Sequence, residues 1–150
     1  MPGLYFDEFE VGRVIAHSVR RTVTEMDNVL FSAMTHNPAP LHIDEDYCQK
    51  NTEFGRRIVN SAFTLGLVVG VSVQDTTLGT TVGNLGFEEV RFPAPVFHGD
   101  TVHAETEVIS VRESKSRPDN GIVLFEHRGY NQDGVLIATI RRSALMRKKP

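Results

Sequence analysis

The chain has 150 residues, of which 40% are hydrophobic and 23% are charged, a composition typical of one globular domain and not of a disordered chain. Its formal net charge of −3 gives no general attraction to phosphate backbones, so nucleic-acid binding is not expected. The single cysteine, Cys48, excludes an internal disulfide and a cysteine-based zinc cluster. We expect one domain over residues 1–150, in the cytoplasm, with no metal and no resident cofactor.

The N-terminal residues are acidic and lack the apolar core of a signal peptide. The longest uncharged run, residues 58–74, is interrupted by polar residues and is shorter than the roughly 20 residues of a membrane span. These two observations predict that the protein has no membrane contact.

The first third of the chain alternates between strand and helix signals. Residues 11–23 are rich in β-branched side chains and predict a strand. Thr24 and Asp27 have the spacing of a capping box, and apolar residues at helical spacing follow them, so an amphipathic helix should begin there and end before Pro38. Two prolines make residues 37–41 an extended loop, and residues 44–50 predict a short helix.

Residues 58–75 are apolar on nearly every side, which predicts a central helix that is buried all round. Ala62, Gly66 and Gly70 lie on one stripe of that helix, where they should leave room for a close neighbour inside the fold. Four strand-like segments separated by turn signals follow: residues 80–92, 100–111, 121–131 and 135–146. The order predicts an α+β fold in which an antiparallel sheet wraps a long central helix.

Two motifs carry a specific resemblance. Pro40-Leu41-His42-Ile43-Asp44 and the later Pro95-Val96-Phe97-His98-Gly99-Asp100 are similar to the signatures of the MaoC-like dehydratase or (R)-specific enoyl-CoA hydratase family. The chain resembles in particular the subgroup of mesaconyl-CoA (β-methylmalyl-CoA) hydratases. This resemblance implies a hot-dog fold, a hydro-lyase that acts on an enoyl-CoA thioester, and a homodimer or a higher assembly of dimers.

The chain departs from the family pattern at three places. Asn37 stands where the family has its catalytic Asp, five residues before the His, and Ala39 stands in place of the family's Asn. Asn60-Ser61 replaces the His-Gly that opens the central helix in many members. The expected mechanism therefore has to work without the usual carboxylate.

Adding water to a double bond conjugated to a thioester needs a base for the water proton and N–H donors for the thioester oxygen. We expect His42 to act as the base, because imidazole titrates near neutral pH. Asn37 takes up no proton, but its amide can orient the water. The N–H of Ser61, with Asn60 beside it, is the expected oxyanion donor, aided by the positive end of the helix. Asn60 and Ser61 could equally serve only to cap the helix.

Several basic residues are candidates for binding the substrate's charged groups. Arg112, Lys115 and Arg117 surround a loop that could meet the phosphates of coenzyme A, or they could be solvated. Arg91 and Arg56 are candidates for a second carboxylate on the acyl group.

Two other functions stay open. Many hot-dog thioesterases use an Asp or Glu within the central helix, and residues 58–74 contain neither. A non-catalytic thioester-binding domain would explain Asn37. A long exposed sheet edge also predicts pairing with a second copy of the chain.

Overall fold

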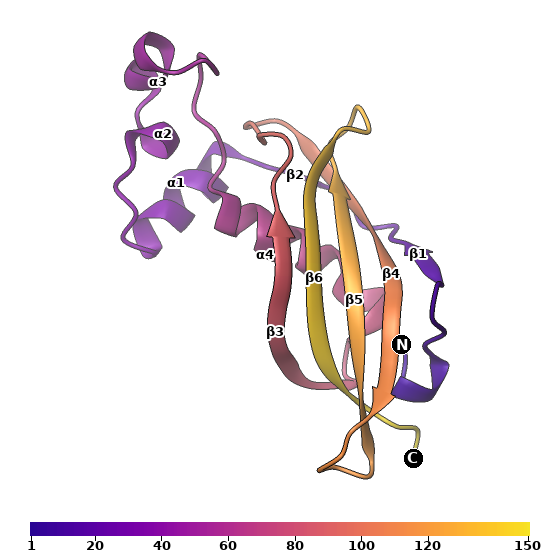
Figure 1. Cartoon of the computed structure of the whole chain (residues 1–150). Coiled ribbons are helices and arrows are strands. Elements are labelled where there is room, and N and C mark those ends of the chain that lie inside the picture. Colours follow the sequence, from indigo (N-terminus) through magenta and orange to yellow (C-terminus); the bar gives the residue numbers. More distant parts are fainter.

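The computed structural model describes all residues, 1–150, and shows a long helix packed against one curved antiparallel sheet (Figure 1). The chain begins with a short 3₁₀ helix, η1, at Phe6–Glu8. The remaining elements, in order, are β1 Val14–Ala16, β2 Arg21–Thr22, α1 Glu25–Met34, α2 Pro40–Ile43, α3 Glu45–Asn51, α4 Ser61–Thr76, β3 Thr81–Arg91, β4 Thr101–Glu113, β5 Asn120–Tyr130 and β6 Leu136–Arg147.

The sheet has six strands in the order β1-β4-β5-β6-β3, and β2 pairs separately with β4. Every pairing is antiparallel, and β5 alternates strictly between buried and half-buried side chains. This alternation places one face of the sheet against α4 and the other toward solvent. The core between α4 and the sheet is built from aliphatic side chains: Val68, Val71, Val102, Ala104, Ile137, Ala138 and Ile140.

Two glycines of β5 allow close packing against that inner face. A Cβ at Gly129 would lie 2.5 Å from a methyl group of Val68 on α4. A Cβ at Gly121 would lie 2.2 Å from the ring of Phe6, which covers the other end of the strand. A side chain at either position would therefore push α4 or η1 away from the sheet.

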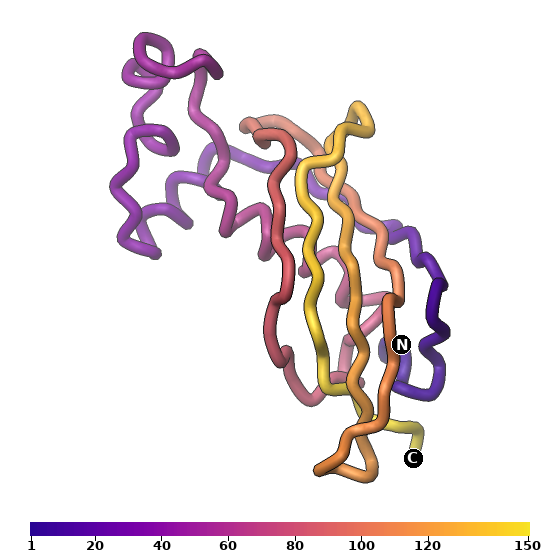
Figure 2. Tube along the Cα trace, viewed as in Figure 1, coloured from indigo at the N-terminus to yellow at the C-terminus, as the bar shows by residue number.

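Helices α1, α2 and α3 form an arm that projects past the sheet at the N-terminal end of α4, while both chain termini lie toward the opposite end (Figures 1 and 2). Arg57, in the segment that returns from the arm, holds it together. Its guanidinium lies 2.8 Å from Glu25 of α1 and 2.7 Å from Glu45 of α3. The arm and α4 thus meet at the segment that precedes Ser61.

The predicted fold class is confirmed. Thr24 and Asp27 form the predicted capping box, with Asp27 N–H donating to Thr24 Oγ1 at 3.2 Å and Thr24 N–H donating to Asp27 Oδ2 at 2.8 Å. The four C-terminal strands begin and end within two residues of their predicted bounds. Gly134 has the positive φ of 74° that the predicted hairpin turn requires.

Two predicted segments are wrong in detail. Residues 11–23 do not form one strand but the separate strands β1 and β2, because the buried ring of His17 draws the chain inward to Asp75 and Thr106. Residues 37–41 are not all extended, since Pro40 begins helix α2. A proline suits the first turn of a helix, where its missing N–H would have no partner in any case.

Helix α4 is not buried all round. Its stripe of Ala62, Gly66, Gly70 and Gln74 is exposed, and a Cβ built on Gly66 or Gly70 meets no atom within 4 Å. The prediction that these glycines admit a close neighbour inside the protomer is therefore wrong. Neither this helix nor any other is long and apolar enough to cross a membrane.

Helix α1 is amphipathic, but it turns its polar face toward the protein and its apolar face toward solvent, the reverse of an ordinary core helix. Its apolar ridge of Met26, Leu30 and Met34 is 72%, 51% and 71% exposed. The side chains that it buries are the polar ones of Asn28 and Ser32. The arm is consequently held to the fold by hydrogen bonds on its inner side together with an edge-to-face contact between Phe31 and Phe63 of α4, whose ring centroids lie 5.7 Å apart.

A chain of polar side chains runs through the interior from Arg142 to Asp75. Arg142 Nε donates to His127 Nε2 at 2.8 Å, so the proton of the neutral His127 ring lies on Nδ1 and is donated to Thr106 Oγ1 at 2.7 Å. The Thr106 hydroxyl then donates to His17 Nε2 at 2.7 Å, and His17 Nδ1 donates to Asp75 at 2.8 Å. A buried cation is thereby linked to a half-exposed carboxylate.

These hydrogen-bonded side chains predict that the free energy of unfolding decreases in acid. Burial lowers the pKa of His127 well below its ordinary value, whereas the unfolded chain takes up that proton near pH 6.5. The contribution of His127 to stability is therefore complete above about pH 6.5 and falls by at most about 1.4 kcal/mol per pH unit below it. His127→Gln retains an acceptor and a donor but does not titrate. In urea unfolding between pH 7 and 5, we expect its free energy of unfolding to be lower at pH 7 and to fall less steeply. Equal slopes in both proteins would contradict this interpretation.

Candidate active site

His42 lies on α2, in the arm, and its ring is oriented by a main-chain carbonyl. His42 Nδ1 is 2.9 Å from the carbonyl oxygen of Ile58, which can only accept, so the proton of the neutral ring lies on Nδ1. Nε2 is left as the proton acceptor. Ile58 also donates its N–H to Leu41 O at 3.1 Å, and the buried Cys48 thiol contacts the same carbonyl at 3.4 Å. The segment that carries His42 is thus fixed by contacts with Ile58 and with Cys48.

Asn37 is positioned by the end of α1. His36 adopts a left-handed conformation with φ 57°, and its N–H and that of Asn37 bond to the carbonyls of Ala33 and Ser32 at 3.2 and 2.8 Å. This is a Schellman ending of the helix. Asn37 Oδ1 accepts the N–H of Ala39 at 3.1 Å, which leaves the Nδ2 amide group to donate elsewhere. Asn37 also lines an open pocket of about 430 Å³ beside α1.

Asn60 and Ser61 lie at the N-terminus of α4. Asn60 is the N-cap, and its Oδ1 accepts the N–H of Ala62 at 3.0 Å, so its side chain is engaged in capping. Ser61 is the first helical residue, and its N–H is one of those that a helix leaves without an internal partner. Ser61 borders a largely apolar pocket of about 230 Å³, which is also lined by Phe54, Phe92 and Pro95.

Asn28 is the residue of this site that the sequence analysis missed. It is fully buried, and its side chain contacts the main chain of His42, Ile58 and Asn60 at 3.2, 3.0 and 2.9 Å. It therefore joins the arm to the start of α4. The available signal was a polar residue at helical spacing from Ser32, on the face of α1 opposite to its apolar ridge.

Two other side chains surround the junction of arm and helix. His98 Nε2 lies 3.0 Å from Asn28 Nδ2, and burial lowers the pKa of His98. The Arg56 guanidinium lies 3.6 Å above the ring of Phe97, whereas Arg91 is paired with Glu89 on the surface of β3. Arg56 thus covers Phe97, the neighbour in sequence of Val96 in the pocket wall. A role for either arginine toward a carboxylate stays a prediction.

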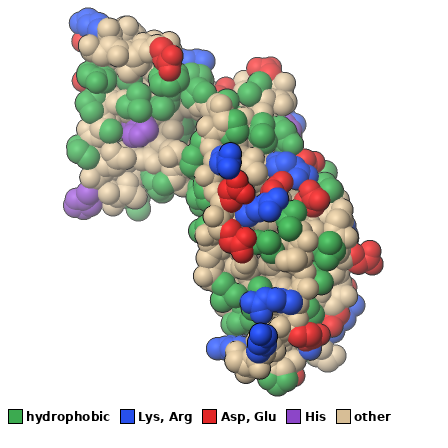
Figure 3. All heavy atoms as spheres, in the orientation of Figure 1, with side chains coloured by type: hydrophobic (Ala, Val, Ile, Leu, Met, Phe, Trp, Pro, Cys, Tyr) green, Lys and Arg blue, Asp and Glu red, His purple; other side chains and the backbone are tan.

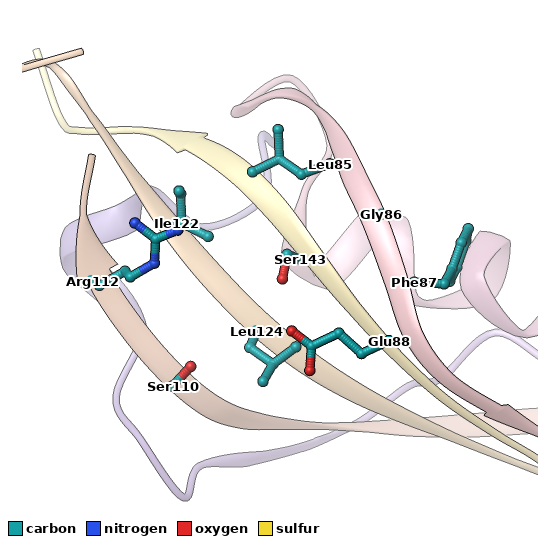
Figure 4. Close-up of a pocket in the computed structure, with 9 residues that line it drawn as sticks. All are labelled: Leu85, Gly86, Phe87, Glu88, Ser110, Arg112, Ile122, Leu124 and Ser143. Atoms are coloured by element: carbon teal, nitrogen blue, oxygen red, sulfur yellow. The ribbon is translucent and has the colours of Figure 1, made fainter. Parts of the chain in front are cut away.

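The three basic residues considered for coenzyme A lie elsewhere in the protomer. Arg112 is near the end of β4, in a pocket of about 350 Å³ on the outer face of the sheet with Ser110, Ile122 and Leu124 (Figure 4). Lys115 and Arg117 follow in the β4–β5 turn. The start of β4 is next to His98, and eleven residues of strand separate it from Arg112, roughly 36 Å. The structure therefore does not bring these three basic residues together with His42 in the protomer.

The chain is similar to known proteins in both sequence and fold. Residues 8–129 match the family model of the MaoC like domain. A mesaconyl-CoA hydratase from Cereibacter sphaeroides is 33% identical over 98% of this chain, which spans 42% of that protein's length. An (R)-specific enoyl-CoA hydratase from Rhodospirillum rubrum is 31% identical over 74% of both chains. A Mycobacterium tuberculosis protein with a double hot-dog fold superposes with a TM-score of 0.87, covering 99% of this chain and 45% of that one, at 22% identity.

The sheet, the central helix and these matches define a hot-dog fold, as predicted. The chain belongs to the MaoC-like domain family. The relatives from Cereibacter sphaeroides and Rhodospirillum rubrum are hydratases by their names, so these two enzymes to which the chain is similar are hydro-lyases.

Proposed function

We propose that this protein adds water reversibly across the 2,3-double bond of an enoyl-CoA thioester, with mesaconyl-CoA and simple enoyl-CoA esters as the first substrates to test. The observation that carries the proposal is the hydrogen bond from His42 Nδ1 to Ile58 O at 2.9 Å, which leaves Nε2 as a proton acceptor and ties the ring to the segment three residues before Ser61. The 31–33% identity with two hydratases supports the same reaction class.

In the proposed step, His42 Nε2 takes a proton from water while the water oxygen bonds to C3 of the substrate. The electrons of the double bond move toward the thioester carbonyl, and as they return C2 takes the proton from His42 Nε2–H, which restores the neutral imidazole. Asn37 donates from Nδ2 to the water and holds it, because its Oδ1 already accepts the N–H of Ala39. His42 alone carries the proton, since Asn37 has no acidic or basic form at ordinary pH.

The Ser61 N–H stabilises the negative charge that develops on the thioester oxygen. Backbone donors at a helix N-terminus combine an unpartnered N–H with the positive end of the helix dipole. Asn60 contributes by capping, since its side chain fixes the first turn of α4. The apolar pocket beside Ser61 is of a size to take a short acyl group.

The thioesterase alternative is less well supported by this structure. Hydrolysis in that class would use a carboxylate on the central helix, and the only one on α4 is Asp75 in its last turn. Asp75 accepts a hydrogen bond from His17 and lies at the far end of the helix from Ser61. Incubation with crotonyl-CoA and mesaconyl-CoA separates the classes. Hydration removes the absorbance of the conjugated enone without releasing a free thiol, whereas hydrolysis releases the thiol.

Substitution of His42 and Asn37 tests the roles of the two residues. We expect His42→Ala to lower kcat by about 10²–10⁴-fold, the usual contribution of a general base, while thioester binding is retained. Asn37→Ala should have a smaller effect, because it removes only an orienting group. Asn37→Asp should move the ascending limb of the pH–rate profile to higher pH, since a carboxylate favours the protonated imidazole.

The matched control is His36→Asn, which changes an exposed histidine at the end of α1 to a residue that tolerates its left-handed conformation. We expect this variant to keep its activity. Near wild-type hydration by His42→Ala would refute the mechanism and favour the non-catalytic thioester-binding alternative.

We also propose that the protein acts as a homodimer. The outer edge of β3 is unpaired, and Leu85 and Phe87 on that strand are exposed. The stripe of Gly66 and Gly70 on α4 is uncovered, and apolar side chains are prominent on the surface of the arm (Figure 3). Soluble proteins seldom leave a long strand edge bare, and two-fold pairing is the commonest way to cover one.

Light scattering at micromolar concentration should give the mass of two chains. Gly70→Leu probes the same surface, because the new side chain has open space within one protomer. We expect it to keep the helical circular dichroism of the wild type and to dissociate into monomers at a higher protein concentration. A wild-type monomer, or an equally stable dimer in Gly70→Leu, would contradict the proposed interface.

A further inference from the structure

The amide group of Asn28 has only one orientation consistent with its partners. The N–H of Asn60 can only donate, so the Asn28 atom 2.9 Å from it is Oδ1. The carbonyls of His42 and Ile58 can only accept, so the atom 3.2 and 3.0 Å from them is Nδ2. The side chain is fully buried, so water cannot substitute for any of these partners.

His98 adds a third acceptor to the same nitrogen. Its Nε2 lies 3.0 Å from Asn28 Nδ2, which can only donate, so the ring is neutral and carries its proton on Nδ1. Burial lowers the pKa of His98, in agreement with a neutral ring. Two N–H groups therefore serve three acceptors, and one of the N–H groups is shared.

The partners of Asn28 belong to the two parts of the site: the proposed base, His42, and the N-terminus of α4. Ile58 O accepts from Asn28 Nδ2 and also from His42 Nδ1, which is 2.9 Å away. Because both lone pairs of this carbonyl are used, its direction is fixed, and the direction of the His42 ring is fixed with it. Asn60, at the other end of the amide, is the cap that precedes Ser61. One side chain thus spans the distance between the base and the start of α4.

We propose that Asn28 is a positioning residue for the reaction: it holds the His42 ring, through Ile58 O, in a fixed relation to the Ser61 N–H. Asn28 touches neither water nor substrate in this role. Its effect on turnover rests on the proposed function, whereas its effect on the His42 ring does not. Loss of the positioning should therefore appear in kcat more than in KM, because the Asn28 side chain itself does not line the apolar pocket beside Ser61.

Asn28→Asp is the sharpest variant, because it has the same shape and keeps an acceptor for Asn60 N–H but loses both donors. We expect kcat to fall on the order of 10²-fold, the cost of a misplaced catalytic group, with KM changed less than about threefold. The matched control is Ser32→Ala. Ser32 is also fully buried on α1, but its hydroxyl contacts only the Asn60 side chain, at 3.4 Å. We expect its kcat to stay within about threefold of the wild type.

A spectroscopic measurement on the substrate-free protein makes the inference independent of the reaction. The ¹⁵N chemical shifts of the imidazole ring should show His42 as a single Nδ1–H tautomer in the wild type and as a mixture in Asn28→Asp. If no thioester is hydrated but the tautomer changes as expected, the proposed function is wrong and the positioning stands. If hydration occurs while Asn28→Asp keeps both kcat and the single tautomer, the positioning alone is overturned.

His98→Ala provides the second variant in case Asn28→Asp does not fold. It leaves Asn28 with two carbonyl acceptors for its two N–H groups, so we expect the His42 tautomer to be unchanged and kcat to stay within about threefold. A mixed tautomer in His98→Ala would transfer the positioning role to His98 and overturn the assignment to Asn28. An Nε2–H tautomer of His42 in the wild type would overturn it without any variant.

Discussion

The packing of one face of α4 against the inner face of β4, β5 and β6 is the contact on which the rest of the structure depends. Val68 reaches the sheet at Gly129, where no side chain stands between them, and Val71 packs among the aliphatic residues of the same layer. The helix is therefore fixed along its length, and its N-terminus projects beyond the sheet toward the arm (Figure 1). The polar groups that surround His42 are connected to that end of α4 through Asn28 and Asn60.

The arm is stabilised differently from the body of the fold. Its buried side chains on α1 are those of Asn28 and Ser32, Phe31 adds an edge-to-face contact with Phe63 of α4, and Arg57 links α1 with α3 through two carboxylates. Hydrogen bonds of this kind are directional, whereas apolar contacts tolerate sliding. A site built from them has a defined geometry, and the apolar side chains of α1 remain on the outside, available to another surface.

Much of the fold could be predicted from local pattern alone. Strand-like segments and the turn residues between them predicted the four long strands, and the capping box predicted the start of α1. Strands β4 and β5 alternate between buried and more exposed side chains, whereas β3 buries none. The pattern could not show which face of α1 turns inward, since a hydrophobic face normally indicates the core and here a polar network replaces it. Likewise, the break at His17 depends on Asp75 and Thr106, which are 58 and 89 residues away. His42 and Asn37 were found by a motif, whereas Asn28 belongs to no motif and acts through main-chain atoms.

Much of the candidate site consists of groups that no point mutation can delete. The partner of the His42 ring is a carbonyl, and the proposed oxyanion donor is a main-chain N–H of α4. Exchange of side chains such as Asn37 or Ala39 can therefore change reactivity or substrate preference while the framework stays in place. Insertions or deletions between α3 and α4 would disturb this framework, because they would move the Ile58 carbonyl itself. For anyone redesigning this protein, residues 52–60 should keep their length, and new chemistry should be sought by substitution around them.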